Sequence, residues 1–375
     1  MEKFSLKDHL FNADKVHMIA TQIKAVYSSF DQEAFEYEAI DKFPALELKE
    51  RINHISDMLF KYLPSGYEKA IDILLRSLPS ELDPEQTDDD FGDYIYAAHS
   101  SYINKYGCTS KHLALSLSAL KEMTKRFSVE YSIRDFINIF EYETMAMLHL
   151  CANSSNYHKR RLASEGSRPS LPWAKNLTLD YADALPLLEK LFSDNTRYVT
   201  RSVANHLNDI SKINPALVIA TLQSWQESKK QNDKEMQFII NHSLRTLIKQ
   251  GYAPALRLLG YSSSPKITVS SLGLAKTSVS IGESLEFCFD IRSAKKERLI
   301  IDYIMHFRTK AGTYSSKVHK IKNTMIDNQK VEFSKKHKFK ANMTTRKLYT
   351  GTHKVQLQIN GKSYDELEFE LLPQI

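Results

Sequence analysis

The sequence is poor in cysteine, and the few cysteines it has form no recognisable pattern. Cys108, Cys151 and Cys288 lie far apart, contain no CxxC pair and match no zinc-ligand spacing. We therefore expect neither a disulfide framework nor a structural metal, and we predict three buried, reduced thiols.

The sequence also lacks a long apolar run and a secretory signal. No stretch could span a bilayer, and the first eight residues include acids where a signal peptide needs a basic patch followed by an apolar segment. We expect a soluble, cytoplasmic protein without a membrane partner. Its 375 residues, 42% of them hydrophobic and 26% charged, are enough for two or three globular domains.

Positive charge is concentrated near the C-terminus. The last 110 residues hold 20 Lys and Arg against 11 Asp and Glu, a net charge of +9, while the preceding residues carry a net charge of −3. This asymmetry indicates a polyanionic partner for the C-terminal region. The alternative is that the lysines serve only solubility and the protection of strand edges.

Residues 1–261 show the apolar periodicity of helices that bury one face. Clear stripes run through residues 16–30, 48–63 and 113–127. Ser128 is a candidate N-cap for a helix running through Ile133 and Phe140.

Short patterns recur within this helical region. Tyr157-x-x-Arg160-x-Leu162-Ala163 returns 41 residues later as Tyr198-x-x-Arg201-x-Val203-Ala204, and two further echoes follow at shifts of 37 and 39 residues. Periods near 40 in helical sequence predict HEAT-like helix pairs that stack into a solenoid. Equivalent helices would then line the concave face, where a long ligand could lie.

After a short polar linker at residues 262–265, the apolar pattern changes to period two in residues 266–375. Asn360-Gly361 has the composition of a two-residue hairpin turn. About seven candidate strands in this region favour an immunoglobulin-like sandwich. The predicted fold class is thus mostly α, a HEAT-like solenoid at 1–261 followed by an all-β immunoglobulin-like domain at 266–375.

The segment from Tyr157 to Lys175 is the most unusual part of the chain. It is rich in Lys and Arg and contains a single acid, Glu165. Gly166 and Pro169 should end its helix, which would place Arg168 and Trp173 on a loop. On pattern alone, Glu165 could be a reactive carboxylate or merely the intrahelical partner of Arg161, worth a few tenths of a kcal/mol.

These residues carry a family resemblance. RRLASEGSRPSLPWA, RSVANHLNDISK and LRTLIKQGYAPALRLLGY resemble the AlkC branch of the HEAT-like alkylpurine DNA glycosylases, and TTRKLYTGTHKVQLQINGKSY resembles the immunoglobulin-like extension of that branch. The resemblance covers essentially the whole chain. It implies a monomeric repair enzyme that acts on double-stranded DNA containing alkylated bases. It further implies excision of N3-methyladenine, and of N3-methylcytosine, without a metal or cofactor and without a deep base pocket.

The resemblance also implies roles for individual residues. The matching catalytic positions are Glu165, Asp209, Glu130 and Trp173, and the matching DNA-binding positions are Arg160, Arg161, Arg168 and Arg201, to which we add Lys175, His158 and Asn205. The chain departs from the family at Lys159 and at Leu150-Cys151, where a tryptophan is expected. Trp173 is then the principal aromatic candidate, with Tyr157 or Tyr198 as helpers, while Trp225 has the surroundings of a core residue.

A carboxylate suits the implied chemistry, because loss of a cationic base leaves an oxocarbenium-like centre on the sugar. Two alternatives from other classes remain at this stage: a HEAT-repeat scaffold that binds protein, and a DNA-lesion binder without catalysis.

Overall fold

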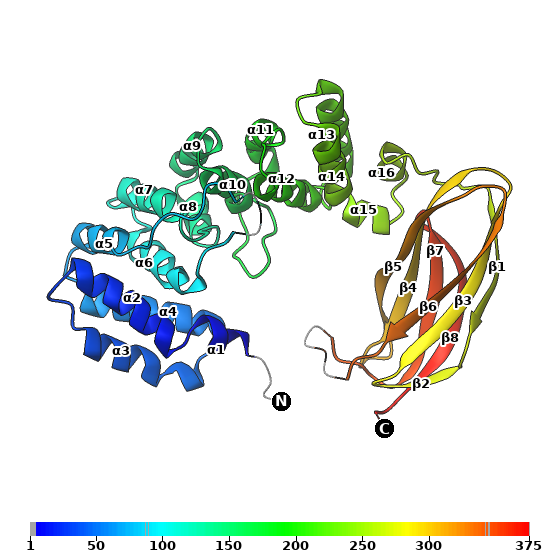
Figure 1. The fold of residues 1–375 in the computed structure, drawn as a ribbon, viewed down its shortest axis with the longest axis horizontal. Helices are drawn as coiled ribbons and strands as arrows, with labels where there is room; N and C mark the ends of the chain where they lie inside the picture. Colours follow the sequence, from blue (N-terminus) through cyan, green and yellow to red (C-terminus); the bar gives the residue numbers. More distant parts are fainter. Residues whose placement is uncertain (1–4, 87, 89, 342, 344–345, 375) are drawn as a thin grey trace. The chain divides into compact units, whose positions relative to one another are not determined.

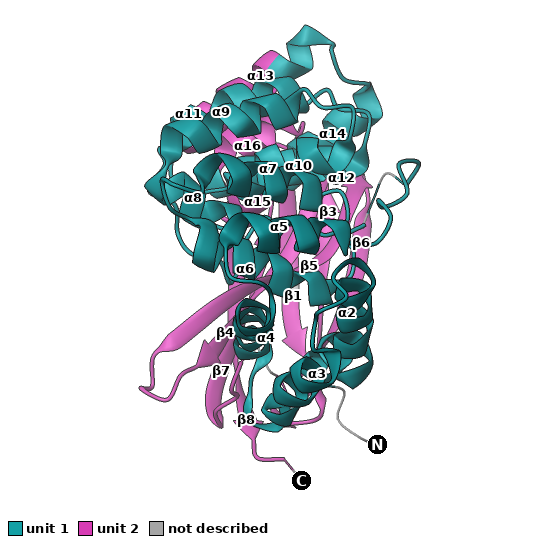
Figure 2. Cartoon of the chain, turned by 90° about the vertical axis from the view of Figure 1, so that its left-hand side faces the viewer, with its two compact units in different colours: residues 1–213, 225–243 teal, residues 214–224, 244–375 magenta. Residues whose placement is uncertain are grey.

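The computed structural model describes residues 5–86, 88, 90–341, 343 and 346–374. Part of the N-terminal stretch considered above, residues 1–4, and the two threonines of the TTRKLY motif lie outside the described residues. The chain divides into two compact units, residues 1–213 with 225–243 and residues 214–224 with 244–375 (Figure 2).

Unit 1 is built from helices, as the apolar stripes predict. Its longer helices are α2 (Ala13–Val26), α3 (Gln32–Asp41), α4 (Leu48–Tyr62), α5 (Tyr67–Arg76), α6 (Ala97–Gly107), α7 (Leu113–Met123), α9 (Glu141–Ala152), α10 (Tyr157–Gly166), α11 (Tyr181–Leu191), α12 (Arg197–Ile210) and α14 (Asp233–Ser243). Shorter pieces are α1 (Leu6–Leu10), η1 (Phe43–Ala45), η2 (Tyr94–Tyr96) and α8 (Ile133–Ile139). Helix α13 (Pro215–Ser228) is shared between the two units.

The helices of unit 1 pack in two layers, in the manner of helical repeats. In one layer α4 contacts α6, α6 contacts α8, α10 contacts α12, and α12 contacts α14. In the other, α5 contacts α7, α7 contacts α9, and α9 contacts α11 (Figure 1). The repeated Tyr157 and Tyr198 motifs lie on α10 and α12, neighbours in the first layer, with the two tyrosine rings 6.0 Å apart. The repeat pattern therefore predicted which helices stack side by side.

Local sequence explains where several helices begin. The side chains of Asn12, Asp31, Asn156 and Asp180 each accept a hydrogen bond from a backbone N–H in the first turn of the helix that follows. The predicted cap at Ser128 is wrong. Helix α8 begins at Ile133, and the Ser128 hydroxyl instead donates to the carboxylate of Glu130.

Unit 2 contains α15 (Arg245–Lys249), α16 (Ala253–Leu258) and a sandwich of two sheets. One sheet has the strand order β1-β3-β6 and the other β2-β8-β7-β4-β5 (Figure 1). The strands are β1 (Ile267–Leu274), β2 (Ser278–Ser280), β3 (Ser284–Ser293), β4 (Glu297–Arg308), β5 (Tyr314–Ile326), β6 (Lys330–Lys338), β7 (Gly351–Ile359) and β8 (Lys362–Leu372). Neighbouring strands are antiparallel except β2 and β8.

The sandwich core follows the period-two pattern. Leu285, Phe287, Phe289 and Ile291 all point into a buried cluster shared by both sheets. The predicted turn between β7 and β8 is confirmed, with positive φ at both Asn360 and Gly361. Gly361 also packs directly on the backbone of Gly251, so close that a Cβ on Gly361 would lie 2.0 Å from the Gly251 Cα.

The cysteine prediction is correct in part. All three thiols are free, but only Cys151 is buried; Cys108 is half-buried and Cys288 is exposed. Cys288 points outward because side chains alternate along β3 and its neighbours Phe287 and Phe289 occupy the inner face. Within the described ranges, no helix combines the length and apolarity needed to cross a membrane.

Candidate active site

A cluster of buried charges occupies one face of the α10–α12 layer in unit 1. Helix α10 carries Arg161 and Glu165, α12 carries Asp209, the turn before α8 carries Glu130, and Arg168 lies just beyond the end of α10. All five residues are at most 7% exposed. Charged side chains are rarely so buried unless they are paired, so their partners decide what the cluster can do.

Arg168 connects two of the carboxylates. Its Nη1 lies 2.6 Å from Oε1 of Glu165, and its Nε and Nη2 lie 3.0 and 2.9 Å from Oδ2 of Asp209. The Ser202 hydroxyl donates to the other Glu165 oxygen at 2.6 Å, and the Lys212 ammonium reaches Asp209 Oδ1 at 3.0 Å.

Arg161 holds the third carboxylate. Its two terminal nitrogens each lie 3.4 Å from an oxygen of Glu130, and its Nη1 also donates to the Ser128 hydroxyl, which in turn donates to Glu130. Its contact with Glu165, the predicted intrahelical pair, is longer at 3.9 Å. Among the described residues, the three carboxylates thus form ion pairs with two buried guanidinium groups and with the half-exposed Lys212.

The arginines keep Glu165 ionised despite its burial. Burial by itself would raise the pKa of this carboxyl, but the adjacent Arg161 and Arg168 and the Ser202 hydroxyl outweigh it, so the pKa lies below its ordinary value. Burial similarly opposes the charge on Arg161, yet Glu130 and Glu165 raise its pKa. The group that remains neutral is His206, whose pKa burial lowers to about 4.

Aromatic side chains surround the charged groups. The guanidinium carbon of Arg161 lies 4.4 Å from the ring centroid of Tyr198 and 5.2 Å from that of Phe91, close enough for cation–π attraction. The Tyr198 hydroxyl is buried and has no hydrogen-bond partner in the described part of the chain. Of the two tyrosines predicted to assist Trp173, Tyr198 lines the cavity that opens onto this cluster, and Tyr157 does not.

A cavity of about 270 Å³ opens onto this cluster. Its wall includes two of the carboxylates, several cations and a set of aromatic rings: Glu130, Glu165, Arg161, Arg168, Arg201, Phe91, Tyr94, Tyr131, Trp173 and Tyr198. We call it the charged cavity. Asp209 is just behind it and reaches it through Arg168.

Trp173 stands at the rim of the charged cavity with 72% of its surface exposed. Its backbone has φ of +64°, an uncommon conformation for a bulky residue. Two hydrogen bonds to carbonyl oxygens hold the loop there: Tyr131 Oη donates to Pro172 at 3.1 Å, and Lys49 Nζ donates to Trp173 itself.

Arg134 anchors the base of the same loop. It is fully buried, and its guanidinium donates to the backbone oxygens of Lys175, Gly166 and Arg168 at 2.6, 3.2 and 2.8 Å. Burial lowers its pKa to about 10, which leaves it charged at neutral pH. These bonds satisfy carbonyls at the end of α10 and fix the turn that brings Arg168 back toward Glu165.

The structure brings most of the predicted site residues together. Arg201, which pairs with Asp88, and Asn205, which is hydrogen-bonded to His242, line the charged cavity. Lys175 pairs with Asp135 outside that cavity, at 2.7 Å. Arg160 pairs with Asp194, and His158 is buried against Tyr157 and Tyr198, with a pKa lowered by burial to about 4.

The structure also places four residues that the repeat, the departures from the family and the core prediction single out. His206, equivalent to Glu165 by the 41-residue shift, has Nδ1 3.0 Å from the Ser164 carbonyl oxygen rather than contacting Glu165. Leu150 is exposed and Cys151 is buried on α9, away from the cavity lining. Trp225 is confirmed as a core residue, stacked on Phe192 with ring centroids 4.4 Å apart.

Sequence reasoning missed four contributors: Ser128, Tyr131, Arg134 and Ser202. Ser202 could have been found from the repeat, because it follows Arg201, the counterpart of Arg160. Arg134 and Ser128 act across 32 to 41 residues of chain, a separation that no local pattern indicates.

The site can stabilise a positive charge at the cavity without a metal ligand set. The described residues contain no group of three His, Cys, Asp or Glu side chains arranged to hold a metal ion. Ionised carboxylates at a solvent-reaching wall can attract a cation and orient a water molecule, and the aromatic rim can add cation–π attraction.

Comparison with known proteins agrees with this arrangement. Residues 268–373 match the family described as "Uncharacterised protein YhaZ, C-terminal Ig-like domain". The chain is 34% identical over 367 residues to a protein of Bacillus subtilis (strain 168), "Uncharacterized protein YhaZ", covering 96% of this chain and 98% of the relative. A solved structure, the Pseudomonas fluorescens alkylpurine DNA glycosylase AlkC bound to DNA containing an abasic site analog, is 30% identical and superposes with a TM-score of 0.87.

That superposition covers 98% of this chain and 99% of the solved one, so it includes both the helical repeats and the β sandwich. The predicted fold class, a HEAT-like solenoid followed by an immunoglobulin-like domain, is confirmed. The chain belongs to the AlkC family of alkylpurine DNA glycosylases.

Proposed function

We propose that this protein hydrolyses the N-glycosidic bond of cationic N3-alkylated bases in double-stranded DNA, N3-methyladenine and also N3-methylcytosine, as a monofunctional glycosylase. The observation that carries the proposal is Glu165. It is a buried carboxylate with a lowered pKa, it lines a cavity, and it shares that cavity with Glu130 and Trp173. The solved AlkC relative, whose DNA contains an abasic site analog, supports the assignment to a reaction that removes a base.

The proposed reaction balances without a cofactor. The bond between the sugar C1′ and the base nitrogen breaks, and both of its electrons go to the base, which loses its positive charge. Water adds to the oxocarbenium-like C1′ and releases one proton to the solvent. Glu165 stabilises the sugar cation and holds this water, while Glu130 and Asp209 contribute negative potential nearby.

The arginines have a supporting role in this mechanism. Arg161 and Arg168 keep Glu165 ionised and hold the three carboxylates in place through hydrogen bonds and ion pairs. We propose this role for them instead of the DNA contacts expected from the sequence. Trp173 and Tyr198 offer aromatic faces to the cationic base, each worth about 0.5–2 kcal/mol. Ordinary bases lack the charge, so selectivity comes from the leaving group rather than from a fitted pocket.

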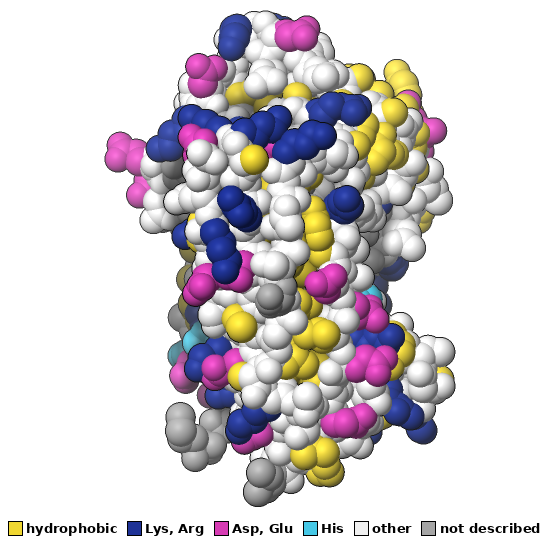
Figure 3. Space-filling model, turned by 90° about the vertical axis from the view of Figure 1, so that its right-hand side faces the viewer, with side chains coloured by type: hydrophobic (Ala, Val, Ile, Leu, Met, Phe, Trp, Pro, Cys, Tyr) yellow, Lys and Arg dark blue, Asp and Glu magenta, His cyan; other side chains and the backbone are white. Residues whose placement is uncertain are grey.

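We propose DNA contacts on unit 1, at and beyond the charged cavity, and on the C-terminal domain. Arg201, Asn205, Lys175, Arg160 and His158 remain the proposed contacts on unit 1. The basic strands of the domain from residue 266 onward are proposed to bind phosphates, with affinity that falls as salt rises. Figure 3 shows one face on which Lys and Arg side chains gather in a band near the top. We further propose a monomeric, cytoplasmic enzyme with domains at 1–261 and 266–375.

The decisive assay is release of free methylated base from alkylated DNA under single-turnover conditions. Glu165→Gln keeps the size of the side chain and removes its charge, so excision should slow by about 100- to 1,000-fold. Glu143→Gln, the same change on an exposed residue of α9, is the matched control and should excise at the wild-type rate. Asp209→Asn and Glu130→Gln in the same assay rank the three carboxylates.

The outcomes separate the candidate functions. If wild-type protein binds alkylated DNA but releases no base above the spontaneous rate, it is a lesion binder rather than an enzyme. If Glu165→Gln is fully active while Asp209→Asn is inactive, the catalytic role belongs to Asp209, and Glu165 is an ion-pair partner of the arginines.

A further inference from the structure

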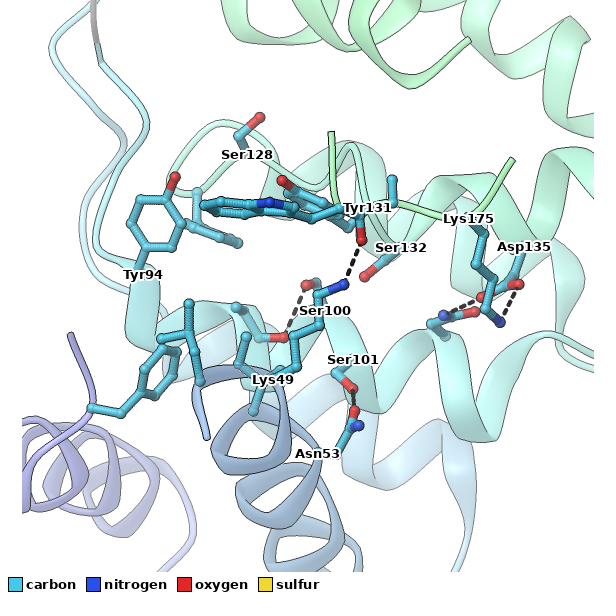
Figure 4. A pocket seen from close by; sticks show the side chains of 18 residues that line it. Lys49, Asn53, Tyr94, Ser100, Ser101, Ser128, Tyr131, Ser132, Asp135 and Lys175 are labelled. Atoms are coloured by element: carbon cyan, nitrogen blue, oxygen red, sulfur yellow. Dashed lines mark hydrogen bonds and ion pairs between the residues drawn. The ribbon is translucent and has the colours of Figure 1, made fainter. Parts of the chain in front are cut away.

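A second cavity, which we call the apolar cavity, lies next to the charged one in unit 1. Its volume is also about 270 Å³, and its walls come from α4, η2, α6, the turn before α8 and the Trp173 loop (Figure 4). In Figure 4, Tyr94, Ser128 and Tyr131 line one side, Lys49 and Ser100 face them, and Lys175 and Asp135 close the far end. Apart from Trp173 and Lys175 at its edge, the residues of this lining have no part in the reaction proposed above.

The two cavities share part of their lining, and the shared residues are aromatic. Tyr94, Tyr131 and Trp173 line both of them. The backbone of the dividing loop is tied to the apolar cavity's own wall by the hydrogen bonds from Tyr131 and Lys49. A planar molecule leaving the charged cavity would therefore meet an aromatic rim with a second hollow directly beyond it.

The two cavities differ in charge. Two carboxylates and three arginines line the charged cavity, whereas apolar and neutral polar groups make up most of the lining of the other. The charged residues that line the apolar cavity are Lys49, Lys175 and Asp135. Lys49 donates a hydrogen bond to the Trp173 carbonyl, and Lys175 Nζ lies 2.7 Å from Asp135 Oδ1, so these two charges neutralise each other. In the first space the ionised Glu165 can attract a cation, whereas the second space suits a neutral aromatic molecule.

This contrast matches the change that the proposed reaction makes in the base, which enters as a cation and leaves neutral. We propose that the apolar cavity is a binding site for a free, neutral N-alkylated purine, the excised base, which passes there across the Trp173 rim. The inference rests on the proposed glycosylase function, and it adds a product site to it.

Size and polarity fit a single base. The volume lies just below the range of about 300–1,000 Å³ that is typical of pockets for drug-sized ligands. Rings of Phe11, Tyr94, Phe127 and Trp173 can stack on a purine. Asn53, with Ser100 and Ser101 on α6, supplies the amide and hydroxyl groups that can hydrogen-bond to its edge.

The test measures binding of free 3-methyladenine to the full-length protein by equilibrium dialysis. Ser101→Phe places a ring in the apolar cavity at a residue that does not line the charged cavity. Ser118→Phe makes the same substitution on the exposed face of α7 and serves as the control. A second filling variant, Ala97→Leu, guards against a folding defect in the first, and melting temperatures are recorded for all.

We expect both filling variants to weaken binding of 3-methyladenine at least tenfold, and Ser118→Phe to leave it unchanged. Single-turnover excision should stay within about twofold of wild type, because the bond-breaking groups are untouched. Added free base should inhibit multiple turnover by wild type and by Ser118→Phe but not by the filling variants.

Several results would overturn the inference. One is free base that binds to folded filling variants as it does to wild type, or that does not bind to wild type at all. Another is loss of single-turnover excision in the filling variants with free-base binding intact, which would mean that the cavity takes a base still attached to DNA. In each case wild type would still excise, so the proposed function would stand; if wild type releases no base, it is the function itself that fails.

Discussion

Arg168 offers the sharpest test of how the site is held together. Its guanidinium compensates two buried carboxylates at once, Glu165 at 2.6 Å and Asp209 at 2.9 Å. Arg168→Met keeps much of the side-chain volume and removes the charge. The ion pairs that remain in the described part of the chain are those of Asp209 with Lys212 and of Glu165 with the more distant Arg161. Removing one partner of a buried ion pair typically costs about 3–5 kcal/mol.

For a helical unit of this size, that loss corresponds to a fall in melting temperature of roughly 6–20 °C. The cost should depend on pH. In the wild type the pKa of Glu165 is lowered, so its contribution to stability is present above the ordinary value of 4.5 and is lost as pH falls through the folded pKa. Without Arg168 that pKa rises, and the deficit of the variant should shrink below about pH 4.5.

The assay is urea denaturation at several pH values, combined with a double-mutant cycle using Asp209→Asn. Because the two side chains contact each other, the double variant should lose less stability than the sum of the single variants, with a coupling of about 0.5–3 kcal/mol. A loss below about 1 kcal/mol for Arg168→Met at neutral pH, or strict additivity with Asp209→Asn, would refute the view of Arg168 as the bridge of the network.

Three other expectations follow from particular side chains. Trp173→Ala should reduce single-turnover excision while shifting the melting temperature little, because the side chain is 72% exposed; a loss of about 3–5 kcal/mol would instead identify a core residue. Asp302, buried on β4, has its pKa raised by burial to about 6, so the folded state gains stability as pH falls from above 6 toward 4. Asp302→Asn should therefore stabilise the protein by about 2–3 kcal/mol at pH 8 but not near pH 4. Denaturation at several pH values measures this, and a gain that is the same at every pH would contradict the prediction. Replacing the exposed Lys317, Lys320 and Lys322 of β5 with Gln should weaken DNA binding and reduce its salt slope by up to about 3; an unchanged slope would place the phosphate contacts elsewhere.

The helical layers could be predicted from sequence because their signal is local and repeated. An apolar stripe reports the buried face of a helix, and the recurrence of the Tyr157 motif at Tyr198 shows that α10 and α12 occupy equivalent places. The alternation in β3 and the Asn360-Gly361 turn are local signals of the same kind. Cys288 was misjudged because a thiol on a strand takes whichever face its position in the alternation dictates.

The ion pairs within the site could not be predicted from sequence spacing in the same way. The pair predicted from spacing, Arg161 with Glu165, is the weaker one at 3.9 Å, whereas the stronger partner is Arg168 at 2.6 Å. Arg168 can reach back only because α10 ends at Gly166 and Arg134 fixes the turn from 34 residues away. Helical spacing predicts contacts between residues of the same helix, so it does not predict a contact with a residue that follows the end of the helix.

The buried charges also bear on why this solenoid is more than a scaffold. Replacing a buried ionic cluster with well-packed apolar side chains is often neutral or stabilising by about 1–4 kcal/mol, so a face that needed only to hold helices together would gain little from three carboxylates and two arginines. Here the cluster is not sealed inside the core, because Glu130, Glu165 and Arg168 line an open cavity. The ionised Glu165 at this wall is available to a cation that arrives from outside, and the proposed substrate, an N3-alkylated base, is a cation before excision and neutral after it.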